Sequence, residues 1–171
     1  MIFGIPIIGE EMELIEDVSP TSGTDVTFAG ISQNYDDLVI VCRQLTCDAA
    51  GVISIWLNGD ETATNYAREF WRHYPSAVEA ASAADSGIAR AGSDTSSMWS
   101  GFIWIPRYSD GVYKKCAQGM GGFGGTGLNN WRNAAWNNVA AINHIKLKHD
   151  KTTWVAPTRF LLYGIRHRRT Q

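Results

Sequence analysis

The chain has 171 residues, of which 44% are hydrophobic and 19% charged, and it carries a net charge of −2 at pH 7. This length and composition suit one globular domain with a substantial core. No apolar run reaches the ~20 residues of a membrane span, no basic stripe indicates nucleic acid, and the N-terminus lacks the basic flank of a secretion signal.

The first predicted element is an N-terminal arm over residues 1–11, followed by a single domain over residues 12–171. Burying one large apolar side chain contributes roughly 1.5–3 kcal/mol, so several together could hold the arm on a partner protein. The alternative is that this segment forms an edge strand of the same domain. The apolar residues of the arm, all candidates for this interaction, are Ile2, Phe3, Ile5, Ile7 and Ile8.

Short apolar runs with period-two alternation follow along the chain, separated by polar or glycine-rich turns. This pattern predicts an all-β fold with two packed antiparallel sheets. Asn58-Gly59 predicts a type I′ turn, because both residues adopt positive φ at low cost. The nine predicted strands are Met12–Val18, Asp25–Ala29, Asp37–Arg43, Val52–Leu57, Asn65–His73, Ser97–Ile105, Gly111–Cys116, Ala141–Lys148 and Arg159–Arg166.

Three segments do not show strand periodicity. The alanine-rich Pro75–Asp94 is compatible with a short surface helix, but an irregular excursion between strands is favoured. Trp131–Val139 has helix-like spacing and asparagines that suit a loop equally well. Gly119–Gly127 contains a formal GxGxxG, yet it lacks the strand-turn-helix setting of a dinucleotide site and predicts a glycine-rich surface loop.

The charge is polarised along the chain. Residues 1–37 hold eight acidic and no basic side chains, whereas residues 141–171 hold seven Lys or Arg against one Asp. We expect the two ends to lie on adjacent strands of one subunit, with contacts between copies as the alternative. The three cysteines, Cys42, Cys47 and Cys116, have no metal-like spacing and predict free thiols in a protein assembled in a reducing cytoplasm.

The sequence predicts neither catalysis nor a cofactor. The four histidines are scattered without zinc spacing, and no GxSxG elbow occurs. The acidic pairs Glu10-Glu11, Asp36-Asp37 and Asp60-Glu61 predict solvated turn carboxylates, with calcium binding near Asp60 as the one variant that stays open. We therefore expect no catalytic, metal or cofactor site, and a protein that is not an enzyme.

Seven tryptophans exceed what a core of this size requires, so some are expected to face outward. Exposed aromatic side chains mark either a protein interface or a sugar-binding surface, and the interface is the more frequent case. Trp99 and Trp131 are the candidates for such an interaction.

Four blocks, taken together and in order, resemble a group of small bacteriophage virion structural proteins. Phe28–Leu38 is similar to the pattern F-x-x-I-x-Q-x-Y-x-x-L, and Asn58–Tyr66 to an NGD-x-x-x-NY hairpin. Ile105–Tyr108 is similar to an IP-x-Y turn, and Leu162–Ile165 to a closing LYGI strand. The blocks span residues 28–165 and thus concern the whole domain.

The resemblance implies a jelly-roll-like β-sandwich of about eight or nine strands on the exterior of a virion assembled in the host cytoplasm. The expected function is that of a tail-associated subunit, part of a fibre, an appendage or a receptor-binding piece. A capsid decoration protein is the alternative, and a carbohydrate-binding or carbohydrate-active module is the second alternative. Expected partners are other virion proteins, further copies in a homotrimer, and, in the receptor-binding case, a host surface glycan.

Overall fold

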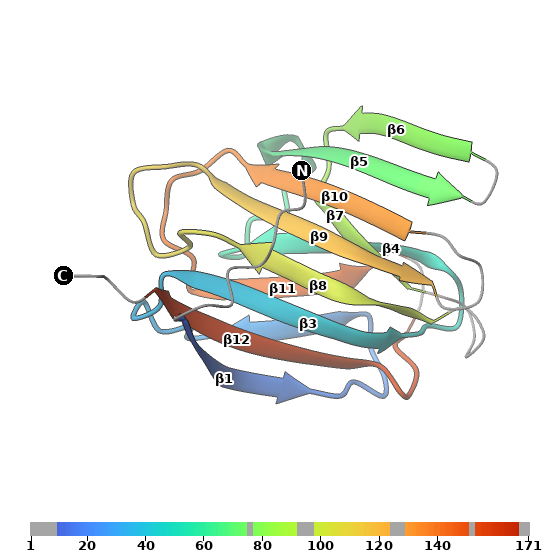
Figure 1. Ribbon diagram of the computed structural model, residues 1–171, viewed down its shortest axis with the longest axis horizontal. Coiled ribbons are helices and arrows are strands. Elements are labelled where there is room, and N and C mark those ends of the chain that lie inside the picture. The colour runs from blue at the N-terminus through green and yellow to red at the C-terminus, as the bar shows by residue number, and fades with distance from the viewer. Residues whose placement is uncertain (1–9, 75–76, 92–97, 124–128, 151–152, 168–171) are drawn as a thin grey trace.

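The computed structural model describes residues 10–74, 77–91, 98–123, 129–150 and 153–167, which form two antiparallel sheets packed as a sandwich (Figure 1). The larger sheet has the order β1-β12-β3-β8-β9-β10-β5-β6, and the smaller sheet the order β2-β11-β4-β7. The elements are β1 (Glu10–Val18), β2 (Asp25–Ala29), β3 (Asp37–Leu45), β4 (Gly51–Leu57), the 3₁₀ turn η1 (Ala63–Asn65), β5 (Tyr66–Tyr74), β6 (Ala77–Ala83), β7 (Gly87–Ala91), β8 (Trp99–Ile105), β9 (Lys115–Phe123), β10 (Asn129–Trp136), β11 (His144–His149) and β12 (Arg159–His167).

Eight of these strands have jelly-roll topology. Numbered by their order in the chain, β1, β2, β3, β4, β7, β8, β11 and β12 are strands one to eight. The larger sheet then contains the order one-eight-three-six, and the smaller sheet the order two-seven-four-five. This is the arrangement of two interlocked Greek keys. The predicted jelly-roll-like sandwich is confirmed, with twelve strands in the described part of the chain where eight or nine were predicted.

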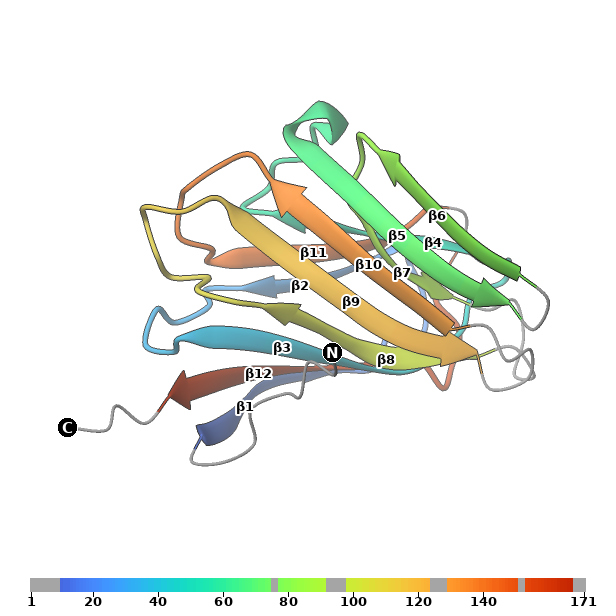
Figure 2. The same cartoon turned by 45° about the horizontal axis from the view of Figure 1, so that its top comes forward.

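Two inserted hairpins widen the larger sheet. β5–β6 is inserted between β4 and β7, and β9–β10 between β8 and β11. The two hairpins are joined to each other by the pairing of β5 with β10. The pairing of β9 with β8 joins them to the jelly-roll strands. β5 and β6 therefore extend past β7, the last strand of the smaller sheet (Figure 2).

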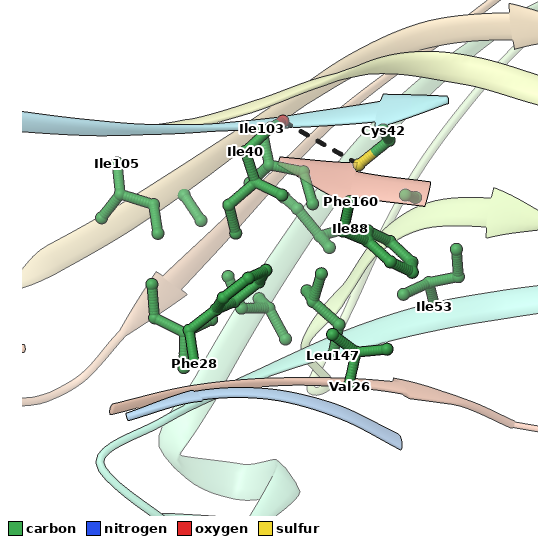
Figure 3. Close-up of a cluster of buried hydrophobic side chains, with 14 of the residues drawn as sticks. Val26, Phe28, Ile40, Cys42, Ile53, Ile88, Ile103, Ile105, Leu147 and Phe160 are labelled. Atoms are coloured by element: carbon green, nitrogen blue, oxygen red, sulfur yellow. Dashed lines mark hydrogen bonds between the residues drawn. The ribbon is translucent and has the colours of Figure 1, made fainter. Parts of the chain in front are cut away.

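The core lies between the jelly-roll strands of the two sheets (Figure 3). Alternation in β4 directs Ile53, Ile55 and Leu57 inward. From β3 on the facing sheet, Leu38 and Ile40 are wholly buried. Interdigitation of such branched side chains from both inner faces excludes water and is the main source of stability in a sandwich.

Eight of the nine predicted strands coincide with observed strands to within a few residues: β1, β2, β3, β4, β5, β8, β11 and β12. The ninth, Gly111–Cys116, is wrong over most of its length, because the chain there makes a turn and β9 begins only at Lys115. Lys115 is buried, and its ammonium donates to the backbone carbonyls of Asp110 and Tyr113 and so holds this turn.

Three strands, β6, β7 and β10, have no counterpart among the predicted strands. The expectation of an irregular excursion over Pro75–Asp94 is wrong, since β6 and β7 occupy most of the segment. The segment left open at Trp131–Val139 contains most of β10. Its inward positions hold Asn130 and Arg132 as well as Ala134 and Trp136. Buried polar residues thus disrupt the apolar alternation by which a strand is recognised in the sequence.

The predicted glycine-rich surface loop is also wrong over its described part, because Gly119–Phe123 belongs to β9, and residues 124–127 of the prediction lie outside the described residues. A Cβ on Gly119 would collide with the backbone carbonyl of Ile88, and one on Gly121 would overlap the indole of Trp99. These glycines are therefore strand residues, placed where another strand or a large ring approaches the backbone closely.

The predicted type I′ turn is confirmed. Asn58 and Gly59 have φ values of 52° and 77°, and the amide of Asp60 donates to the carbonyl of Leu57 over 3.0 Å. The turn does not join two paired strands, however. It leads the chain out of β4 in the smaller sheet toward β5 in the larger one.

The acidic and basic ends of the chain lie side by side, as predicted for one subunit. β1 pairs antiparallel with β12, and ion pairs join Asp17 to Arg159 and Glu13 to Arg166. The last two residues of the predicted arm, Glu10 and Glu11, belong to β1. The remainder of the arm, with the candidates Ile2, Phe3, Ile5, Ile7 and Ile8, lies outside the described residues and stays a prediction.

The structure carries Cys42, Cys47 and Cys116 as free cysteines, as expected. Burial raises the pKa of all three thiols, that of Cys47 to about 12 and that of Cys42 further. Cys42 and Cys47 are buried, whereas Cys116 is half-exposed on the outer face of β9.

We predict that thiol titration of the denatured protein without reductant recovers all three thiols. In the native protein Cys116 should react first, because the reagent attacks a thiolate that it can reach and the other two cysteines are buried. Recovery of a single thiol after denaturation would show a disulfide and contradict the prediction.

We also predict that Gly121→Ala lowers the free energy of unfolding by about 1–3 kcal/mol, because the added methyl overlaps both the Trp99 ring and the backbone carbonyl of Ser100 in a close-packed layer. The matched control is Gly111→Ala, whose added methyl meets no atom within 4 Å and should change stability by less than about 0.5 kcal/mol. Denaturant unfolding measures both. Equal effects of the two substitutions would show that packing against Trp99 is not the cause.

Candidate functional site

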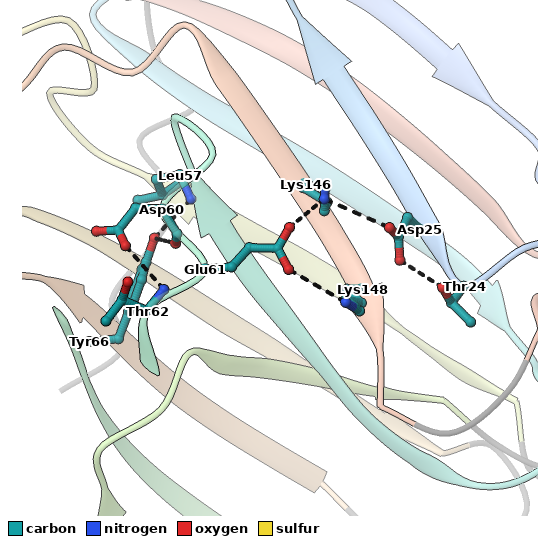
Figure 4. A network of polar contacts seen from close by, with 9 residues as sticks. All are labelled: Thr24, Asp25, Leu57, Asp60, Glu61, Thr62, Tyr66, Lys146 and Lys148. Atoms are coloured by element: carbon teal, nitrogen blue, oxygen red, sulfur yellow. Dashed lines mark hydrogen bonds and ion pairs between the residues drawn. The ribbon is translucent and has the colours of Figure 1, made fainter. Parts of the chain in front are cut away.

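The two outer faces of the sandwich differ in polarity. On the smaller sheet, Lys146 and Lys148 of β11 form ion pairs with Glu61, and Lys146 also pairs with Asp25 (Figure 4). On the larger sheet, five large hydrophobic side chains are exposed from β1, β5, β6 and β9. These side chains are Met12, Leu14, Trp71, Val78 and Met120. The smaller sheet thus presents a polar surface to water, and the larger sheet an apolar one.

The strand register aligns apolar residues in one row across the outer face of the larger sheet. Each residue of the row is the cross-strand partner of the next, so their side chains are neighbours on one face. From β12 to β6 the row consists of Leu161, Val41, Phe102, Met120, Trp131, Trp71 and Ala80. We call this set the apolar row. It is largely buried at Leu161 and open at Trp71, whose exposed fraction is 58%.

The open end of the apolar row forms a groove of about 630 Å³, which we call the tryptophan groove. The indoles of Trp71 and Trp131 meet edge to face with their centres 6.2 Å apart. Val78 and Met120 add further apolar surface, and polar groups lie at His73 and Asn129. The full lining is Trp71, Arg72, His73, Val78, Met120, Gly121, Gly122, Asn129, Asn130 and Trp131.

Of the two tryptophans chosen from the sequence, the structure places only Trp131 in this groove. Trp99 is wholly buried against Gly101 and Gly121, so its selection as a surface residue is wrong. Trp71 was missed, although its strand was predicted. Because Phe70 precedes it and faces inward, alternation along the strand places Trp71 on the opposite face.

The groove lies beside an edge strand with little protection against further pairing. The described residues of β6 are exposed over nearly its whole length, its side chains are small, and Glu79 is its one charge. The opposite edge, β1, carries several acidic side chains and a β-bulge between Leu14 and Glu16. Charges and bulges discourage an edge from adding another strand, so β6 is the edge better suited to pair.

The four sequence blocks meet elsewhere, among the turns at one end of the sandwich. The hydroxyl of Tyr108 donates to the carbonyl of Ser32. The side-chain Nε2 of Gln33 donates to the backbone carbonyl of Ile142 over 2.9 Å. Gly164 lets the ring of Tyr35 lie against β12. These residues connect turns far apart in the sequence, so their role is to fix the fold.

Asp60 belongs to the same turn region, and its carboxylate accepts several N–H groups. Its donors are Nε1 of Trp136 at 2.8 Å, Nδ2 of Asn65 at 2.9 Å and the amide of Thr62 at 3.1 Å. The first two bonds lower the pKa of Asp60 most. Since N–H donors occupy both carboxylate oxygens, we assign Asp60 to turn stabilisation, not to calcium binding. Figure 4 also shows Tyr66 at the Asp60 carbonyl.

The expectation of solvated turn carboxylates is wrong for Asp37. Asp37 is buried and accepts the indole N–H of Trp104 at 3.0 Å and the amide of Arg107 at 2.8 Å. Within residues 10–74, 77–91, 98–123, 129–150 and 153–167, no three metal-ligating side chains gather as a metal site would require. The same ranges contain no helix of the length and apolarity needed to span a membrane.

No family model matches the chain, and neither the curated proteins nor the solved structures contain a match to it.

We predict that Asp60→Asn lowers the stability at neutral pH, because an amide cannot accept all three N–H donors. The folded protein depresses the pKa of Asp60, so the stabilisation is complete above the ordinary value of 3.8. It is lost as the pH falls through the lower folded-state value. The melting temperatures of parent and variant should therefore begin to converge below about pH 4 and meet only below the folded-state pKa of Asp60. Glu69→Gln, an exposed acid on β5, is the control and should change little at any pH; a pH-independent gap for Asp60→Asn would contradict the prediction.

Proposed function

We propose that this chain is a structural subunit on the exterior of a bacteriophage particle, tail-associated, and that it acts by binding another protein and not by catalysis. The observation that supports binding is the apolar row, which runs across the larger sheet and opens into the tryptophan groove. The assignment to a phage particle rests on the four sequence blocks.

The chemistry of the groove favours a protein over a sugar. Trp and Met are enriched in protein interfaces, where a few buried aromatic side chains provide most of the affinity. Sugars need several hydrogen-bonding groups beside the ring on which they stack. Here Trp71 and Trp131 are flanked by Val78 and Met120, which make the lining of the groove mainly apolar.

The proposed occupant is an extended apolar segment of a neighbouring subunit. Such a segment would pair with the free edge of β6 and direct alternate side chains into the groove, which is the usual geometry of β-strand addition. Within this chain, residues 1–9 have that apolar composition. Arm exchange between copies would generate a closed homo-oligomer, of which the homotrimer is the form we propose.

We predict that Trp71→Ala reduces association at least tenfold while changing the free energy of unfolding by less than about 0.5 kcal/mol, as expected for an exposed contact residue. Val112→Ala is the matched control, because Val112 is equally apolar and exposed but lies in a turn remote from the groove. Light scattering after size exclusion measures association.

Two further measurements test the parts of the proposal separately. A peptide of residues 1–9 should bind a protein lacking these residues, and Trp71→Ala should weaken that binding. A peptide that does not bind, with Trp71→Ala particles assembled normally, would refute the groove as the docking site. The position of the chain in a density map of intact particles tests the virion assignment, and a capsid position would favour the decoration role.

A further inference from the structure

Four arginines gather on the inner side of the widened sheet, where it extends past β7. Arg68 and Arg72 come from β5, Arg132 from β10 and Arg90 from β7. We call this set the arginine cluster. Arg132 has an exposed fraction of 0%, and the side chains of Arg68 and Arg72 retain 12% and 15%.

Three of these guanidiniums surround one aromatic ring. The Cζ atoms of Arg68, Arg72 and Arg132 lie 5.1, 4.3 and 5.3 Å from the centre of the Phe70 ring. The ring face attracts cations, but it cannot accept the directed hydrogen bonds of a guanidinium fork.

Carboxylates form ion pairs with Arg68 and Arg72, the more exposed arginines of the cluster. Arg68 pairs with Asp85 at 3.1 Å, and Arg72 with Glu79 at 3.4 Å. Arg132 donates from Nε to Oδ1 of Asn130 at 3.2 Å, whereas its Nη1 and Nη2 have no hydrogen-bond partner among the residues that the structure describes. Two donor groups of a wholly buried cation thus lack an acceptor, at a high cost in free energy.

The local field increases this cost. Burial, together with the positive charges of Arg68, Arg72 and Arg90, lowers the pKa of Arg132 to about 9, although the carboxylate of Asp85 acts in the opposite direction. A negative ligand would reverse both effects, because it supplies charge and acceptor atoms together.

The donors also converge on one place. Nη1 of Arg68 and Nη1 of Arg132 lie 2.5 and 3.1 Å from the position that a Cβ on Gly87 would occupy. The absence of a side chain at Gly87 lets two guanidiniums approach the β7 backbone from different strands. Arg68 and Arg72 reach the surface and mark the route by which a ligand would enter.

We propose that the arginine cluster is a binding site for a tetrahedral oxyanion of the phosphate or sulfate type, held by Nη groups of Arg132 and Arg68. Guanidinium forks match such oxyanions in geometry and form their strongest hydrogen bonds with them. The bound ion would join β5, β10 and β7 and stabilise the widened half of the sheet.

The test is thermal unfolding of the full chain in increasing inorganic phosphate, with sodium chloride added to hold the ionic strength constant. The parent should show a saturable rise in Tm of about 3 °C or more, since a ligand that binds only the folded state stabilises it by mass action. Arg132→Met should abolish the rise. In chloride alone this variant should melt at or above the parent, because an unpartnered buried cation has been replaced by an apolar side chain.

Arg107→Gln is the matched control, since this arginine side chain is 67% exposed in a distant turn, and it should keep the full response. Arg68→Gln provides a second variant on the entry side should Arg132→Met not fold, and it should weaken phosphate binding at least tenfold in calorimetric titration. A parent whose Tm responds to phosphate no more than to chloride would overturn the proposal. An undiminished response in Arg132→Met or Arg68→Gln would overturn it equally.

Discussion

The structure depends on a mismatch in width between its two sheets. A four-stranded sheet cannot cover an eight-stranded one, so the hydrophobic sandwich is confined to the jelly-roll strands, the strands that β7 contacts and Tyr66 at the start of β5. Beyond β7, the inner side of β5 lacks a facing sheet, and its inward positions alternate between Arg68, Phe70 and Arg72. Long side chains with charged ends can cover apolar surface while keeping their heads near water, which makes them suitable for such an overhang.

The part of the larger sheet that the two inserted hairpins add is called the extension below. The same mismatch in width explains why its two faces differ from those of an ordinary sandwich. In an ordinary sandwich the inner face is apolar and the outer face polar. In the extension the inner face carries the arginine cluster, whereas the outer face carries Trp71, Val78 and Met120. The apolar row continues across the outer face of the jelly-roll strands, which ties the extension and the framework into one surface.

Sequence patterns predicted the framework well because its residues obey simple alternation. Ile53, Ile55 and Leu57 reveal β4, and the doubly apolar Leu38–Cys42 reveals the central β3. Most strands of the extension were not predicted because their residues break this alternation for physical reasons. Arg132 occupies an inward position, and Gly119 and Gly121 make room for neighbouring groups. β6 is too exposed to need hydrophobic residues. Only half of the tryptophan groove was predicted, because Trp131 was chosen from the sequence and Trp71 was not. Choosing both requires knowing which face of each strand is covered.

Three of the four blocks that resemble virion proteins, in contrast, lie in the framework, where Tyr108, Gln33 and Gly164 hold turns together, and the block Asn58–Tyr66 leads from the framework strand β4 into the inserted β5. They identify a scaffold and not the surface that we propose to bind a partner. Each inserted hairpin leaves and rejoins the jelly roll between consecutive strands, so either can lengthen or change its side chains without moving the eight framework strands. A chain built in this way can vary what it attaches to while keeping a constant scaffold, and the joint between β5 and β10 means that the two insertions must change in concert.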